Sequence, residues 1–211
     1  MNLFLNNLIE SPRFYLSWVF IVIFSICMHE CAHAFTALKC GDDTATKEGH
    51  LSLNPWIQMG PTSMIILILF GIAWGAVPVN VANFRRKTDG ALVAFAGPLM
   101  NLVLCITMAL VAVLLIKFVG DDHPVHEFFL FASIANGVLF LFNMLPVPMF
   151  DGWSIFSLFI PAMQHVSAQQ ARNAGMMFLA LVFLTPLGSA VWNAGSWLGF
   201  SSMTLWTVLL T

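Results

Sequence analysis

The sequence predicts an all-α polytopic membrane protein, a helical bundle with one small membrane-associated β-hairpin or re-entrant segment. Two observations carry this prediction. The 211 residues are 59% hydrophobic and only 9% charged, which is far more apolar than a soluble domain. The apolar residues also gather in long stretches separated by short polar segments, as expected for helices that cross a bilayer. The net charge of −2 gives no indication of a nucleic-acid partner.

The first predicted span runs from Leu16 to Leu38. With its histidines neutral, Glu30 is the only charged residue in it. As a helix this stretch would be about 34 Å long, which is enough to cross the hydrocarbon core of a bilayer. No small-residue cleavage site follows it, so we expect the span to act as an uncleaved anchor.

The segment from Thr62 to Val81 is compatible with two paths through the membrane. Its first half is apolar but short, and either a crossing or a re-entrant path is compatible with it. Val77, Val79 and Val81 then alternate with other residues, a pattern typical of a strand, and Pro78 would confine that strand to a sheet edge.

Three further spans are expected, at Gly90 to Ile116, from Phe128 onward, and at Ala174 to Leu198. A polar turn at residues 121–127 separates the first two. The span from Phe128 runs into a stretch with Pro146 and Pro148, which cannot continue a regular helix. Backbone opened at membrane depth must face protein or a water-filled cavity. We expect one domain over residues 1–211, with a core of about residues 16–160.

The basic residues predict the orientation of the chain. If residues 62–81 re-enter, six of the eight lie on one side, which is then the cytoplasmic side. These six are Lys39, Lys47, Arg85, Arg86, Lys87 and Arg172.

The first span contains the motif His29-Glu30-Cys31-Ala32-His33. Histidines four residues apart lie on one face of a helix and can share one Zn²⁺. The glutamate between them is the residue type that such sites use as a general base. The alternative is a pair of hydrogen-bonded core histidines with no metal.

A catalytic zinc commonly has three protein ligands and one open position. Asp151 is the only acidic residue after Glu127, and it lies just past the proline break. An uncompensated carboxylate at membrane depth is costly, and metal binding would compensate it. The alternative is that Asp151 caps the helix that follows the break.

Three motifs then occur in an order typical of one family: His29-Glu30-x-x-His33, Ala96-Gly97-Pro98-x-x-Asn101 and Asn143-x-x-Pro146-x-Pro148-x-x-Asp151-Gly152. Together they resemble the site-2 protease family of intramembrane zinc metalloproteases. Residues 49–55 and 77–80 resemble the short members of that family, which lack PDZ and CBS domains. The chain differs slightly in having Phe150 where leucine commonly precedes Asp-Gly.

The resemblance implies a three-helix catalytic core in which His29, His33 and Asp151 bind one Zn²⁺ per chain. Glu30 would be the catalytic base, and Asn143 would hold the substrate or polarise its scissile carbonyl. Asn143 has an alternative role as a partner for the backbone opened near Pro146.

Two further positions remain open. Asn101 matches a family position on the second core helix, and its alternative role is a hydrogen bond between helices. His50 is either a surface residue or a gating residue beside the substrate.

By the same resemblance, the chain would be an intramembrane zinc endopeptidase that cuts in or near transmembrane segments of single-pass membrane proteins. It would sit in the bilayer of a bacterial plasma (inner) membrane, with its active site nearer the cytoplasmic face. An extended substrate would pair with a strand near residues 77–81 or 50–53. The identity of the substrate and the oligomeric state remain open.

Two other functions compete with this one. A catalytically inactive zinc-binding membrane protein or a metal transporter needs ligands but no positioned base, so the intact Glu30 argues against it. A protease built like the prenyl-protein proteases takes a glutamate from a later helix as its third ligand. No glutamate follows Glu127, which disfavours that architecture.

Overall fold

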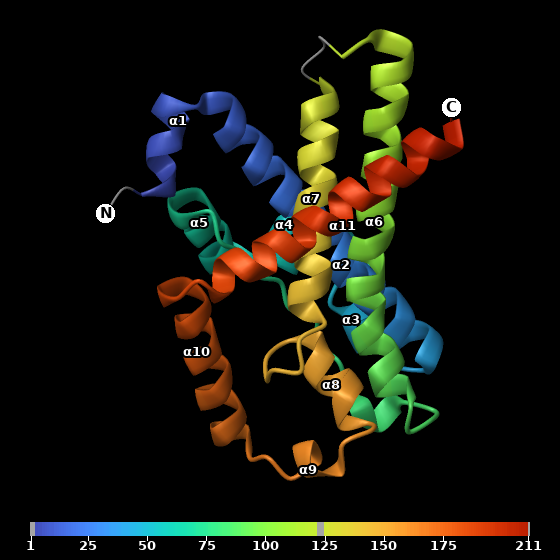
Figure 1. Cartoon of the computed structure of the whole chain (residues 1–211). Coiled ribbons are helices and arrows are strands. Elements are labelled where there is room, and N and C mark those ends of the chain that lie inside the picture. Colours follow the sequence, from blue (N-terminus) through green and yellow to red (C-terminus); the bar gives the residue numbers. More distant parts are fainter. Residues whose placement is uncertain (1–2, 122–124, 211) are drawn as a thin grey trace. The chain divides into compact units, whose positions relative to one another are not determined.

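The computed structural model describes residues 3–121 and 125–210, and within them all regular secondary structure is helical (Figure 1). The chain divides into two compact units, residues 1–89 and residues 90–211. Residues 122–124 of the predicted polar turn lie outside the described residues.

The first unit is built on one long helix and several short ones. Its elements are η1 (Phe4–Asn6), α1 (Asn7–Glu10), α2 (Pro12–Cys40), α3 (Thr44–Lys47), α4 (Pro55–Gln58), α5 (Gly60–Phe70) and η2 (Val81–Asn83).

Helix α2 contains the first predicted span and extends it at both ends. Pro12 starts the helix, where its fixed φ is favourable and no backbone N–H is missed. Gly41 ends it in the left-handed conformation, with φ at 109°, as glycine commonly does after a helix. The buried side of α2, including Ile26 and Cys27, packs against Met59 and Leu67 of the segment that holds α4 and α5.

The predicted β-hairpin is wrong. Between α5 and η2 the chain forms neither helix nor strand, and the described part of the protein contains no strand elsewhere. The alternating valines do not pair with a second strand. Instead, the backbone N–H of Trp74 donates to Ser63 Oγ (2.9 Å), that of Ala76 to the Gln58 carbonyl (3.1 Å), and that of Asn80 to Asp42 Oδ2 (2.7 Å).

Asp42 anchors the end of this segment to the end of α2. Its side chain is fully buried, and Oδ1 accepts hydrogen bonds from Thr44 Oγ1 (2.6 Å) and Asn83 Nδ2 (2.9 Å), in addition to the bond from Asn80 N to Oδ2. Burial alone would raise the pKa of this carboxyl. The hydrogen bonds from Thr44, Asn83 and Asn80 outweigh burial and lower the pKa to about 2.

This lowered pKa predicts an acid-sensitive contribution to stability. Because the folded-state pKa lies below the unfolded-state value, the stabilisation is complete above about pH 4 and is lost as the pH falls toward 2; its size is about 2 kcal/mol. Thermal unfolding in detergent should show wild type more stable than Asp42→Asn at pH 6, with the difference narrowing at pH 2.5. A difference in melting temperature that stays constant between these pH values would contradict the assignment.

The second unit consists of two long helices, two short helices and a bent pair. Its elements are α6 (Asp89–Val119), α7 (Val125–Asn143), α8 (Asp151–Ser157), α9 (Pro161–Gln164), α10 (Ala168–Leu184) and α11 (Leu187–Leu210). Helix α6 begins on the last residue of the first unit.

Helices α7 and α11 pack closely because two glycines of α11 lie directly against the backbone of α7. A side chain on Gly195 would overlap the backbone of Val138, and one on Gly199 would press on the backbone of Ile134. Such small residues let helices approach where no water is available to drive association.

A buried amide pair joins α6 to α7. Asn101 Nδ2 donates to Asn136 Oδ1 (3.0 Å), and Asn136 Nδ2 donates to the Ala132 carbonyl (2.9 Å). Both asparagines are almost completely buried. The sequence left two roles open for Asn101, a family position on the second core helix or a hydrogen bond between helices. The structure shows the hydrogen bond between helices.

The predicted last span, Ala174 to Leu198, is wrong as a single helix. Helices α10 and α11 meet at an angle of 81°. Thr185 between them is extended, with φ at −130° and ψ at 168°. Pro186 explains the break, since a proline disfavours helical backbone at the preceding residue.

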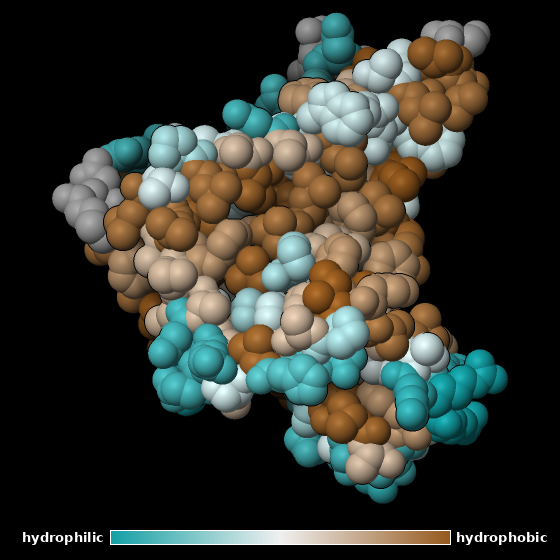
Figure 2. Space-filling model, turned by 60° about the horizontal axis from the view of Figure 1, so that its bottom comes forward, coloured by the Kyte–Doolittle hydropathy of each residue, from teal (hydrophilic) through white to brown (hydrophobic). Residues whose placement is uncertain are grey.

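Three described helices are long and apolar enough to cross a membrane: α2, α6 and α7, or up to four spans if the bent pair counts as one. Helix α5 is apolar but shorter. Large apolar side chains are exposed on the long helices, for example Phe20 on α2 and Val103 on α6, and Figure 2 shows hydrophobic residues covering much of the visible surface.

Candidate metal centre

Helix α2 brings the two histidines of the motif together, as the sequence predicts. His29 Nε2 and His33 Nε2 are 2.9 Å apart, and the two rings are nearly perpendicular at 81°. Each residue is only 7% exposed. The pair thus places two ring nitrogens close together at a buried position.

This donor pair fits zinc. Two nitrogens bound to zinc at about 2.0–2.1 Å in tetrahedral geometry lie about 3.3 Å apart. The separation in the structure, 2.9 Å, is within a few tenths of an ångström of that value. Imidazole is among the commonest zinc ligands, so the residue types and the spacing of the two nitrogens both suit one zinc ion.

Glu30 is buried beside the histidines and is also 7% exposed. Its side chain packs directly against Gly75, in the irregular segment between α5 and η2. A Cβ atom built on Gly75 would overlap the Glu30 carboxyl group. Glu30, the candidate general base, is therefore covered by the backbone of Gly75 on one side.

Asp151 lies in the second unit, as the first residue of α8, and it is half-buried. The N-cap of α8 is Phe150, which has extended backbone. Asp151 is thus one position past the cap, so the structure does not support the alternative that it serves as the N-cap.

The turn before Asp151 follows from the two prolines. Helix α7 ends at Asn143, and the chain turns through residues 144–150 with Met149 in the left-handed region at φ 83°. Gly152 follows Asp151 because any side chain there would overlap the carbonyl oxygens of Met144 and Leu145. The Asp-Gly pair of the motif is therefore a packing requirement as well as a chemical one.

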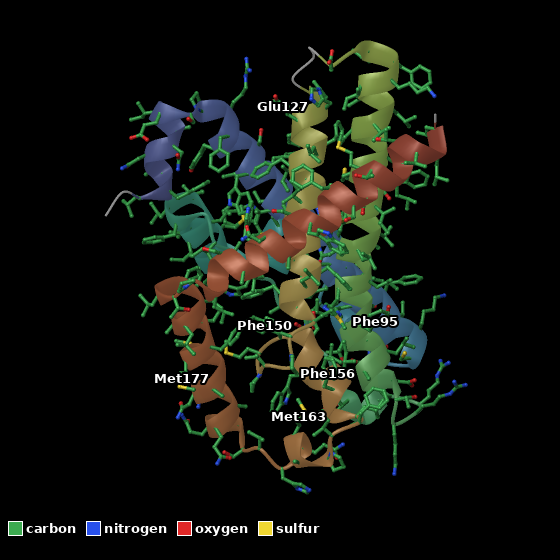
Figure 3. The ribbon with its side chains drawn as sticks, viewed as in Figure 1. Phe95, Glu127, Phe150, Phe156, Met163 and Met177 are labelled. Carbon is green, nitrogen blue, oxygen red and sulfur yellow. The ribbon has the colours of Figure 1, made fainter. Side chains whose placement is uncertain are left out.

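The ring of Phe150 packs this turn against two neighbouring helices, α7 and α10. Its ring lies 4.5 Å from that of Phe142 on α7 and 5.9 Å from that of Phe178 on α10, between ring centroids. Figure 3 labels Phe150 beside the turn. A phenylalanine in place of the usual leucine therefore belongs to an aromatic cluster that holds the residue before Asp151.

Asn143 is the last residue of α7, and its Nδ2 donates to the Leu139 carbonyl one turn earlier (3.0 Å). This bond satisfies backbone near the opened stretch, in line with the alternative role.

His50 is buried and hydrogen-bonded. Its Nδ1 lies 3.0 Å from Gln58 Oε1, and Gln58 Nε2 donates to the carbonyls of His50 (2.7 Å) and Ser52 (2.6 Å). His50 is therefore not a surface residue. Gln58, Ser63 and Gly75 were not singled out from the sequence, because only their tertiary contacts distinguish them.

Comparisons with known proteins identify a family and metalloprotease relatives for this chain. The model of "Peptidase family M50" matches residues 120–187. The chain is 38% identical over 188 residues to "Putative zinc metalloprotease YwhC" of Bacillus subtilis (strain 168), a match that covers 84% of this chain and 86% of that protein.

Two more distant relatives carry one name, "Putative zinc metalloprotease Rip2". The protein of Mycobacterium tuberculosis (strain H37Rv) is 30% identical over 177 residues, covering 77% of this chain and 64% of that protein. The protein of Mycolicibacterium smegmatis is 28% identical over 176 residues, covering 78% and 65%. No solved structure matches the chain.

The apolar helices, the buried histidine pair and these relatives define an integral membrane zinc metalloprotease. The chain belongs to peptidase family M50, the site-2 protease family. It is an enzyme, and its cofactor is Zn²⁺.

Proposed function

We propose that this metalloprotease hydrolyses peptide bonds in or near the transmembrane segments of single-pass membrane proteins. The supporting observation is the position of the histidine pair and Glu30 within a candidate membrane span. Helix α2 has 29 residues and is about 43 Å long, longer than the roughly 30 Å hydrocarbon core. His33 lies about 10 Å from its end, which is within the bilayer if the helix crosses it.

His29, His33 and Asp151 are the proposed zinc ligands. A catalytic zinc commonly has three protein ligands, and the two imidazoles of α2 would supply two of them. Asp151 has a suitable carboxylate, is half-buried, and is held by a rigid turn between Phe150 and Gly152. This assignment makes both units parts of one metalloprotease domain over residues 1–211.

Zinc bound there would lower the pKa of a water molecule to near 7 and would polarise the substrate carbonyl. Glu30, as general base, takes a proton from the attacking water while the oxygen bonds to the carbonyl carbon. The same carboxyl then returns the proton to the leaving nitrogen as the C–N bond breaks. The net reaction adds one water across one peptide bond.

Asn143 has a proposed role in holding the substrate. An amide at the end of α7, next to the opened turn, offers a donor to a substrate carbonyl if its bond to Leu139 is exchanged.

The proposed location is a bacterial plasma membrane, with the site nearer the cytoplasmic face. The relatives named above come from bacteria. Lys39 lies in the last turn of α2, closer to the histidine pair than Arg13 at the other end, and basic residues mark cytoplasmic ends.

A reconstituted cleavage assay tests this function. Purified enzyme in liposomes should cut a reporter with a single transmembrane segment, and mass spectrometry should place the cut in or near that segment. Chelation should stop the reaction and added Zn²⁺ should restore it. The control is a reporter with the same soluble flanks joined by a hydrophilic linker. Equal cleavage of both reporters within the flanks would overturn the proposal.

A further inference from the structure

The segment Trp74–Ala76, here called the strap, lies against the carboxyl group of Glu30. Gly75 is its centre, and a Cβ atom there would overlap Oε1, Cγ and Cδ of Glu30. The backbone of Gly75 is not in the left-handed region, so its conformation suits any residue. The space taken by Glu30 is therefore the reason that a larger residue does not fit.

Buried polar groups hold the strap on both sides of Gly75. Ser63 Oγ donates to the Trp74 carbonyl (2.6 Å) and accepts from the Trp74 N–H (2.9 Å), while the Ala76 N–H donates to the Gln58 carbonyl (3.1 Å). Ser63 and Gln58 are essentially inaccessible to solvent. These bonds are protected from competition with water, so the strap is an anchored element.

The anchor is tied to the same helix that carries Glu30. Trp18 Nε1 donates to the Gly71 carbonyl (2.8 Å), and the Tyr15 hydroxyl donates to the Ile68 carbonyl (3.0 Å). Both donors lie on α2, and both acceptors lie at the end of α5, from which the strap continues. These two bonds tie the start of the segment that leads into the strap to helix α2, N-terminal to Glu30.

We propose that Gly75 is a positioning residue that fixes the Glu30 carboxyl for proton transfer, with Ser63 holding the strap in place. This inference rests on the proposed role of Glu30 as the catalytic base. A side chain at position 75 would displace the carboxyl, because the three nearest atoms to a Cβ built there all belong to Glu30. Misplacement of a catalytic group by about 1 Å can cost about 100-fold in rate.

The first test is the kinetics of Gly75→Ala. It should lower kcat by about 100-fold, leave KM within about twofold, and keep the zinc content of wild type. Gly60→Ala is the matched control. Gly60 has φ at 71° and no neighbour within 4 Å of a built Cβ, so its alanine variant carries backbone strain without touching Glu30. Its kcat should stay close to that of wild type.

The second test is a double-mutant cycle on thermal stability, which needs no activity. Gly75→Ala should lower the melting temperature by several degrees, and that loss should largely disappear in a Glu30→Ala background, where the overlapping atoms are gone. The loss caused by Gly60→Ala should be the same in both backgrounds. A packing role unrelated to Glu30 would give no coupling.

Ser63→Ala keeps the proposal testable if Gly75→Ala does not fold. It removes both bonds to Trp74 without adding atoms, and it should lower kcat with KM and zinc content retained. The proposal is overturned if either variant keeps the kcat of wild type, or if Gly75 and Glu30 show no coupling. If Glu30→Gln remains active, the proposed base fails instead, while a measured coupling would still confirm the contact.

Discussion

Glu30→Gln should lower the rate of cleavage of the transmembrane reporter by about 100-fold or more and leave the bound zinc in place. Glutamine has nearly the same shape as glutamate, so the packing against Gly75 is kept, but its neutral amide cannot accept the proton of the attacking water. General-base catalysis contributes about 10²–10⁴-fold, and a loss in that range is expected. Single-turnover cleavage in liposomes and metal analysis of the same sample measure both quantities.

Glu48→Gln provides the matched control for this loss. Glu48 is an exposed residue of the same unit, at the end of α3, and its neutralisation should leave the cleavage rate unchanged. Residual activity of Glu30→Gln within tenfold of wild type would show that another group removes the proton. Loss of zinc from Glu30→Gln would instead indicate a role for Glu30 as a ligand.

Asp151→Ala should weaken zinc binding severely and, as a consequence, abolish cleavage. Removal of residues that only support zinc ligands typically costs 10–100-fold in affinity, so loss of a direct ligand should cost more than about 100-fold. Competition with a chelator of known affinity measures the change. Asp151→Asn, which keeps a weaker oxygen donor, should fall between wild type and alanine.

Asp121→Ala is the control for Asp151. Asp121 is an exposed acid of the same unit, and its removal should not affect zinc affinity. If Asp151→Ala binds zinc as tightly as wild type, the third ligand lies elsewhere and the motif has been misread. A folded variant is required for this conclusion, and an unchanged melting profile of the zinc-free protein establishes it.

The long helices were predictable because their sequences lack charge over a length that crosses a bilayer. Helices α2, α6 and α7 confirm three predicted spans. Their ends were less predictable: α2 extends beyond Leu16 and Leu38, since Pro12 and Gly41 set its limits. The break after Asn143 was predictable from Pro146 and Pro148.

Other features depend on contacts that the sequence does not reveal. Alternating valines predicted a strand, but strands need partners, and the N–H groups of the segment are taken by Ser63, Gln58 and Asp42. Nothing in the sequence around Gly75 distinguishes it from other glycines of the chain. Its significance appears only when Glu30, far away in the sequence, is found against it.

The candidate site was predictable in part for the same reason. His29 and His33 lie one helical turn apart, so the period of the helix alone brings their ring nitrogens together. Asp151 and Asn143 are distant from them in sequence, and no local rule connects them to the histidines. Their assignment came from the order of motifs in the family, and it remains a prediction.

The most direct test of the ligand assignment is an experimental structure of the zinc-loaded protein with anomalous diffraction recorded at the zinc absorption edge. One peak is expected, bonded to Nε2 of His29, Nε2 of His33 and a carboxylate oxygen of Asp151, at about 2.0–2.2 Å. A zinc peak on both histidines with the Asp151 carboxylate beyond bonding distance and another residue in its place would contradict the account.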